Sequence, residues 1–265
     1  IDGGTGADDL ATFYLPISTV GSIRAVDGTG ADSGKIFIER VDGAEVEVIA
    51  MITMTADGAI VQGLGSAAFW GTDTITNIDS LLFSVESADP ASPYAPDQHA
   101  FVQLASGIVS DGYVAGSTVF IDANDNGVLD AGEASTVTDA AGNFALASAS
   151  AGTIRAVGGI NIDTGLPNQL TLTAPEGSSV INPLTTLVQA IVEQGAGTIT
   201  LEQAQGQLLS SLGLAADLDL ANVDIVQVAA TDPAALAAQR GAVMVATILV
   251  GGGEAAGGAE ASAAM

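Results

Sequence analysis

The chain contains no cysteine, so disulfide bonds, thiolate metal sites and cysteine nucleophiles are excluded from its 265 residues. Histidine is almost as scarce, because His99 is the only one. The chain therefore lacks the Cys and His residues that catalytic triads and transition-metal clusters need. Neither a His-Glu-x-x-His motif nor a Gly-x-Ser-x-Gly motif occurs. We expect no catalytic residues and no organic cofactor here, and we assign His99 to surface or interface structure.

Positive charge is also scarce. Five Lys and Arg residues stand against 31 Asp and Glu residues, which gives a formal net charge of -26 at pH 7. Phosphate backbones and anionic membrane surfaces repel such a chain, so we expect no nucleic-acid partner. Pairs of carboxylates arise from this composition alone and do not indicate glycosidase chemistry. The acidity suits an exterior rich in salt and calcium, where divalent cations offset part of the self-repulsion.

Long apolar runs and aromatic clusters are missing too. The longest largely apolar run, residues 241–250, is too short to cross a bilayer, and we expect a buried helix and no membrane span. The chain opens with neither Met nor a signal peptide, and we expect it to be part of a longer protein. Trp70, Tyr94 and Tyr113 leave a sugar-stacking platform open as an alternative, although their scatter favours core or interface packing.

One motif with specific chemistry is present, in residues 122–133. Gly127 stands at position 6 of this twelve-residue loop, where the backbone must turn sharply, and the carbonyl of Val128 supplies position 7. Side-chain oxygens at positions 1, 3, 5, 9 and 12 come from Asp122, Asn124, Asn126, Asp130 and Glu133. Calcium takes six to eight oxygens, and a final Glu can give two of them. The spacing matches an EF-hand loop and predicts a Ca²⁺ site. The alternative is an Asn/Asp-rich turn without metal, which has no need of the final Glu.

The residues around the loop favour strands. Residues 117–121 precede it and residues 135–138 follow it, and both segments are rich in β-branched side chains. An EF-hand has helices at these places. We therefore predict that calcium staples a β-domain and does not operate a helical switch.

The whole chain is expected to be mainly β with a C-terminal α-helical part. Its predicted sections are a β-rich domain at 1–83, a Pro-rich linker at 84–100, a β-sandwich at 101–180, helices at 181–250 and a flexible Gly/Ala tail at 251–265. Period-2 patterns and turn residues predict strands at 35–41, 45–52, 59–62, 117–121, 143–148, 153–157 and 169–173.

Three helices follow from capping residues and apolar stripes. The first helix is predicted to be capped by Asn182 and to end at Gly195, and the second to be capped by Thr200 and to end at Gly213. The third is predicted to be capped by Asp232 and to stop at residues 251–253. Pro183 fits the first position of the first helix, and Gln203 completes a capping box in the second. We expect the stripes to be packing surfaces.

The amino terminus resembles the Gly/Asp nonapeptide of RTX calcium β-rolls. Residues 3–10 read Gly-Gly-Thr-Gly-Ala-Asp-Asp-Leu. The resemblance implies that Asp8 is a calcium ligand and that Leu10 points into the roll, at the end of an array; the alternative is an isolated turn. Residues 71–83 resemble the segment that often follows such repeats in exported proteins.

A second resemblance covers roughly residues 108–250. Residues 110–122, the loop and residues 138–144 resemble SdrD B-like or Cna-B-like surface domains, which are immunoglobulin-like sandwiches of bacterial adhesins. Residues 158–165, 174–177 and 182–187 resemble segments that accompany this module in large bacterial exoproteins. The Lys–Asn crosslink frequent in Cna-B domains cannot form within the module, because the only lysine is Lys35.

These resemblances imply a non-enzymatic, calcium-stabilised structural protein of the bacterial cell surface, such as an adhesin, an S-layer protein or a filament subunit exported by an RTX-type route. Its expected partners are further copies of itself, other surface proteins and glycans. Two alternatives remain open: a carbohydrate-binding accessory module, and a non-catalytic part of a larger exported hydrolase.

Overall fold

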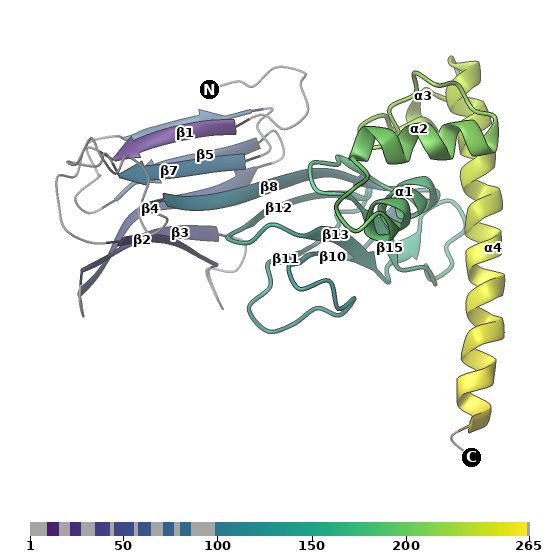
Figure 1. The fold of residues 1–265 in the computed structure, drawn as a ribbon, viewed down its shortest axis with the longest axis horizontal. Helices are drawn as coiled ribbons and strands as arrows, with labels where there is room; N and C mark the ends of the chain where they lie inside the picture. The colour runs from purple at the N-terminus through teal and green to yellow at the C-terminus, as the bar shows by residue number, and fades with distance from the viewer. Residues whose placement is uncertain are drawn as a thin grey trace. The chain divides into compact units, whose positions relative to one another are not determined.

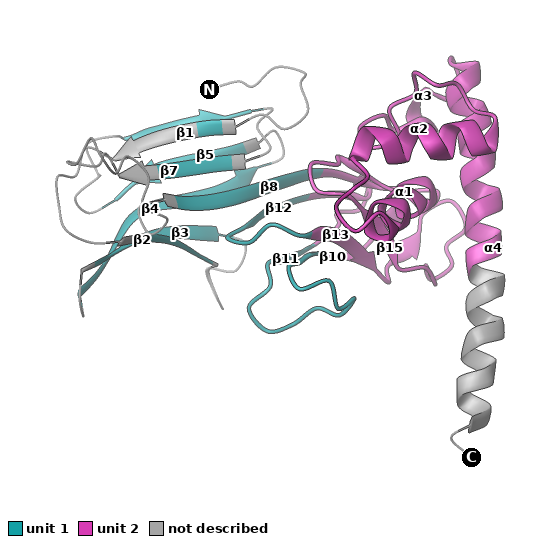
Figure 2. Cartoon of the chain, in the orientation of Figure 1, with its two compact units in different colours: residues 1–106, 120–136, 145–152 teal, residues 107–119, 137–144, 153–265 magenta. Residues whose placement is uncertain are grey.

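The computed structural model describes residues 10–15, 22–27, 35–42, 45–55, 58–64, 71–76, 80–85 and 99–263. The chain forms two compact units, coloured separately in Figure 2. Unit 1 comprises residues 1–106, 120–136 and 145–152, and unit 2 comprises residues 107–119, 137–144 and 153–265.

The first sheet of unit 1 is antiparallel throughout, because each strand pairs with the next one along the chain (Figure 1). Its strands, in order, are β2 (Ser22–Asp27), β3 (Lys35–Asp42), β4 (Glu45–Thr55), β5 (Gly58–Gly63) and β6 (Thr72–Ile75). Such neighbours need only short turns, which the Gly- and Asp-rich segments between them favour.

The second sheet joins strands that are distant in sequence. Strand β1 (Leu10–Leu15) pairs in parallel with β7 (Ser80–Val85), and β7 pairs antiparallel with β8 (His99–Val109). Strand β12 (Asn143–Ser148) follows β8 in the sheet, and the short β16 (Val180–Ile181) also pairs with β8.

One buried apolar cluster joins the two sheets into a sandwich. Alternate residues of β3, such as Ile36 and Ile38, are buried, as the period of two requires of a strand with one face in a core. Leu81, Phe83 and Val102 of the second sheet belong to the same cluster and are fully buried. The predicted end of the Pro-rich linker, at residue 100, lies within β8. The linker was predicted from composition, which does not reveal that β8 pairs with β7.

Two smaller sheets complete the β structure. One has the order β11 (Ser135–Val137), β10 (Thr118–Asp122), β13 (Thr153–Val157) and β15 (Leu172–Ala174). The other pairs β9 (Val114–Ala115) with β14 (Ile160–Asn161).

The helices follow in the last third of the chain. They are α1 (Pro183–Gln194), α2 (Leu201–Leu212), α3 (Ile225–Val228) and α4 (Pro233–Ala263). The predicted caps of the first two are confirmed, since Asn182 and Thr200 each form a capping box and Gly195 and Gly213 stand at the C-caps. Leu184 and Val188 of α1 pack in one buried cluster with Leu208, Leu220 and Ile225. The expectation of a mainly β chain with a C-terminal helical part is confirmed.

Helix α4 differs from its prediction at one end. Asp232 accepts a hydrogen bond from the Ala234 amide, as expected of a cap, but the helix does not stop at residues 251–253. Unlike proline, glycine keeps its N–H donor, so each glycine disfavours the helix by only about 1 kcal/mol, and the alanines that follow favour it. None of the described helices is both long and apolar enough to cross a bilayer.

Candidate calcium loop

The predicted calcium loop connects two neighbouring strands. Strand β10 ends at Asp122, which is also the first residue of the loop, and β11 begins at Ser135. The amide of Ile121 donates to the carbonyl of Ala134 at 3.1 Å, which closes the base of the loop. The prediction of strand flanks is therefore confirmed.

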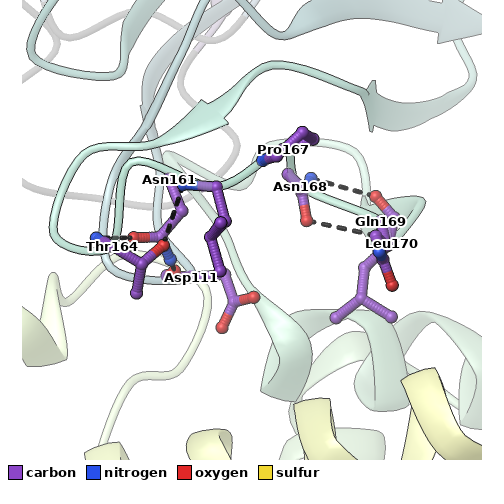
Figure 3. A pocket seen from close by; sticks show the side chains of 8 residues that line it. Asp111, Asn161, Thr164, Pro167, Asn168, Gln169 and Leu170 are labelled. Carbon is purple, nitrogen blue, oxygen red and sulfur yellow. Dashed lines mark hydrogen bonds between the residues drawn. The ribbon is translucent and has the colours of Figure 1, made fainter.

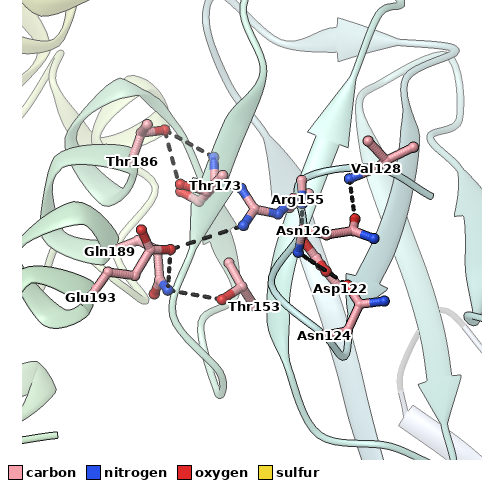
Figure 4. Close-up of polar contacts among 11 residues, drawn as sticks. Asp122, Asn124, Asn126, Val128, Thr153, Arg155, Thr173, Thr186, Gln189 and Glu193 are labelled. Carbon is pink, nitrogen blue, oxygen red and sulfur yellow. Dashed lines mark hydrogen bonds and ion pairs between the residues drawn. The ribbon is translucent and has the colours of Figure 1, made fainter. Parts of the chain in front are cut away.

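The carboxylate of Asp122 anchors the first half of the loop. It is fully buried, and its Oδ1 and Oδ2 accept the backbone N–H groups of Asn126 at 3.1 Å and Gly127 at 2.8 Å. The Oδ1 atom of Asn124 also accepts from the Asn126 amide, at 3.0 Å (Figure 4). Gly127 has a φ of +81°, a left-handed conformation that suits the sharp turn predicted at position 6.

Glu133 closes the second half of the loop. Its Oε1 accepts from the Ala123 amide at 2.9 Å, and its Oε2 accepts from the Asp130 amide at 3.0 Å. The last residue of the motif therefore returns to the first turn. A plain Asn/Asp turn would not require this contact.

The amide side chains between these ends face Asp130. Its Oδ2 accepts from Asn124 Nδ2 at 2.9 Å and from Asn126 Nδ2 at 2.6 Å. Asn126 Oδ1 accepts from the Val128 amide at 2.8 Å, and the Val128 side chain is exposed.

The predicted ligands suit calcium chemically, because the Asp, Asn and Glu side chains and the Val128 carbonyl all offer hard oxygen atoms. Each amide oxygen that accepts one backbone N–H keeps a second lone pair for an ion. However, no three His, Asp or Glu side chains within the described ranges gather into a group that could hold a metal. The carboxylates of Asp122, Asp130 and Glu133 therefore do not converge on one point in this structure. For an ion to bind among them, the NH₂ groups of Asn124 and Asn126 must turn away from Asp130.

Of the other residues singled out from the sequence, the structure describes His99 and Tyr113. Asp8, Trp70 and Tyr94 fall outside the described residues, and of His99 the structure describes the backbone, at the start of β8. Tyr113 does not offer a free phenol, because its hydroxyl donates to Asp224 Oδ2 at 2.8 Å.

A cleft that was not predicted lies in unit 2 (Figure 3). It has a volume of about 320 Å³ and is lined by Asp111 and by residues of the segment 161–170. Burial raises the pKa of the Asp111 carboxyl. Asn161 shapes the rim, because its Nδ2 donates to the Asp111 carbonyl and its Oδ1 accepts from the Thr164 amide. The Asn161 side chain is thus engaged by the backbone of Asp111 and of Thr164.

A scan against protein-family models, a search of curated proteins and a search of solved structures each found no match to this chain.

Proposed function

We propose that the chain is a non-enzymatic, calcium-stabilised structural segment of an extracellular bacterial surface protein: an adhesin, an S-layer protein or a filament subunit. The observation that supports it best is the loop at residues 122–133. Its first carboxylate holds the turn, its last carboxylate returns to the first turn, and both ends continue into strands.

Electrostatics supports a stabilising role for the ion. Three carboxylates stand among the proposed ligands within these twelve residues, in a chain with a formal net charge of -26. A divalent cation would offset their repulsion and would bind the folded loop in preference to the unfolded chain. At a concentration 100-fold above its dissociation constant, such a ligand adds about 2.7 kcal/mol to the free energy of unfolding.

The same geometry argues against a calcium sensor. Sensor EF-hands respond to the ion by opening a pair of helices. Here the loop is flanked by β10 and β11, and the hydrogen bond from the Ile121 amide to the Ala134 carbonyl closes its base. Calcium bound in this place would rigidify a hairpin.

The test is thermal unfolding in excess calcium and in chelator. We expect calcium to raise the melting temperature by several degrees, given about 2–4 °C per kcal/mol for domains of 150–250 residues. Glu133→Gln should lose most of the shift, since a neutral amide is a weaker calcium ligand. Glu202→Gln is the matched control, because it removes the same charge from an exposed position of α2 and should keep the shift. Equal melting temperatures of the wild type in calcium and in chelator would contradict the proposal.

A carbohydrate-binding module is the second candidate, with less support. Its aromatic platform would need Tyr113, whose hydroxyl is held by Asp224. Glycan-array binding that is lost in Tyr113→Ala and kept in Glu133→Gln would favour this function over the calcium scaffold.

A further inference from the structure

A buried hydroxyl, a buried amide and a carboxylate meet where α1 packs near β13 (Figure 4). The Nε2 atom of Gln189 donates to Thr153 Oγ1 at 2.8 Å and to Glu193 Oε1 at 3.0 Å. Thr153 and Gln189 are each 6% exposed. We propose that these two side chains become joined by an intramolecular ester bond, with release of ammonia.

The orientation of the Gln189 amide is fixed by Glu193. A carboxylate can only accept a hydrogen bond, so the NH₂ group and not the oxygen of the amide must face it. The nitrogen that points to Glu193 is the same one that points to Thr153. The threonine hydroxyl therefore lies beside the leaving group of the proposed reaction.

The reacting atoms are already close. The amide carbon Cδ is about 1.33 Å from Nε2, and Nε2 is 2.8 Å from Thr153 Oγ1. Oγ1 therefore lies no more than about 4.1 Å from Cδ, near the separation of about 3–3.5 Å from which bonds form. Because the hydroxyl accepts from the planar NH₂ group, the Gln189 amide must rotate to turn a face of Cδ toward Oγ1 before the bond can form.

Further contacts hold α1 in this position. Thr173 of β15 donates its amide to Thr186 Oγ1 at 2.9 Å, and its carbonyl accepts from Thr185 Oγ1 at 2.9 Å. β15 pairs with β13 in the register Ile154 to Ala174. One end of α1 is therefore pinned to the neighbour of β13, which keeps Gln189 beside Thr153.

The chemistry balances without an oxidant, a reductant or a metal. Thr153 Oγ1 attacks Cδ of Gln189, the Oγ1–Cδ bond forms and the Cδ–Nε2 bond breaks. The hydroxyl proton ends on the departing nitrogen, which leaves as ammonia. The proton passes directly from Oγ1 to Nε2 across 2.8 Å, and Glu193 keeps that nitrogen oriented by accepting a hydrogen bond from it.

The surroundings suit both formation and persistence of the ester. The Glu193 side chain is 48% exposed, which gives ammonia an exit, and Arg155 Nη2 lies 4.0 Å from its Oε1 as a balancing charge. Thr153 and Gln189 are buried, which keeps water from the product. The crosslink would close a segment of 36 positions in a chain that has no cysteine for a disulfide.

The experiment is a mass measurement of the wild-type protein, purified folded and then denatured. We expect it to be one ammonia, or about 17 Da, lighter than its sequence. Trypsin then gives the decisive readout, because it cleaves after Arg155 and so separates peptide 41–155 from peptide 156–240. The ester should hold these two peptides together in denaturant, until hydroxylamine releases them. A full mass with two separate peptides would overturn the proposal.

A succinimide at Asn126 and Gly127 would cause the same loss of mass, but it lies wholly within peptide 41–155. A mass deficit with separate peptides therefore also overturns the proposal. Thr153→Val and Gln189→Glu should abolish the crosslink, whereas Thr153→Ser keeps a hydroxyl and should retain it. Glu193→Gln should slow its formation. If a variant fails to fold, the mass and the tryptic peptides of the wild-type protein still test the proposal.

Discussion

At the scale of single residues, Tyr113 combines two unusual properties. Its φ of +44° is rare for a side chain other than glycine, and its hydroxyl reaches Asp224, the N-cap of α3. Burial, followed by the hydrogen bond from the hydroxyl to Asp224, raises the pKa of Tyr113 to about 12. The tertiary contact therefore favours the neutral phenol over the phenolate.

The raised pKa predicts a pH dependence at the alkaline end. An unfolded chain releases the Tyr113 proton near pH 10 and the folded chain near pH 12, so this contribution to stability is complete below pH 10 and is lost as the pH rises to about 12. Absorbance titration at 295 nm should show a late phase of tyrosine ionisation near pH 12, and Tyr113→Phe should remove that late phase. A late phase that persists in the variant would assign the shift to another tyrosine.

At the scale of elements, the pairing of β8 with β16 depends on a glycine. A Cβ atom on Gly107 would stand 1.8 Å from the Ser179 carbonyl oxygen, the same oxygen that accepts from the Ile108 amide. Because this obstacle is backbone, it cannot rotate away. Gly107→Ala should lower the free energy of unfolding in urea by about 4 kcal/mol or more, the range of exceptional substitutions.

Gly206 provides the matched control for this substitution. It is exposed in α2, and an added methyl group would point into open space beside the helix. Gly206→Ala should therefore raise the free energy of unfolding by about 0.5–1 kcal/mol. If both variants lost a similar free energy of unfolding, the close approach of the Ser179 carbonyl to Gly107 would not be the cause of the loss.

The elements also show which features sequence patterns can predict. The caps at Asn182 and Thr200 and the strands that flank residues 122–133 depend on neighbours within a few positions, and their predictions match the structure. The calcium ion itself stays a prediction. Strands β1 and β7 were not predicted, because they pair across about 70 positions and local patterns do not report their partners. The same reason hides Thr153 and Gln189, whose proximity exists only once α1 is placed beside the sheet.

At the scale of the whole molecule, charge is the dominant property. A net charge of -26 implies self-repulsion that folding increases by bringing carboxylates closer. Monovalent salt should therefore raise the melting temperature at pH 7, because ions screen this repulsion over about 10 Å at 0.1 M. The salt effect should shrink near the isoelectric point of about 4.1. An equal salt effect at both pH values would show that repulsion is not its cause.

The contiguity of the loop has a consequence for the order in which the protein folds. All its proposed ligands lie within twelve successive residues, so a calcium ion could select the bent conformation as soon as this segment meets calcium. The contact between Tyr113 and Asp224 spans 111 positions and must wait until both distant segments are present. Calcium would thus act early, as a local nucleus, while the tyrosine contact would mark the completion of folding.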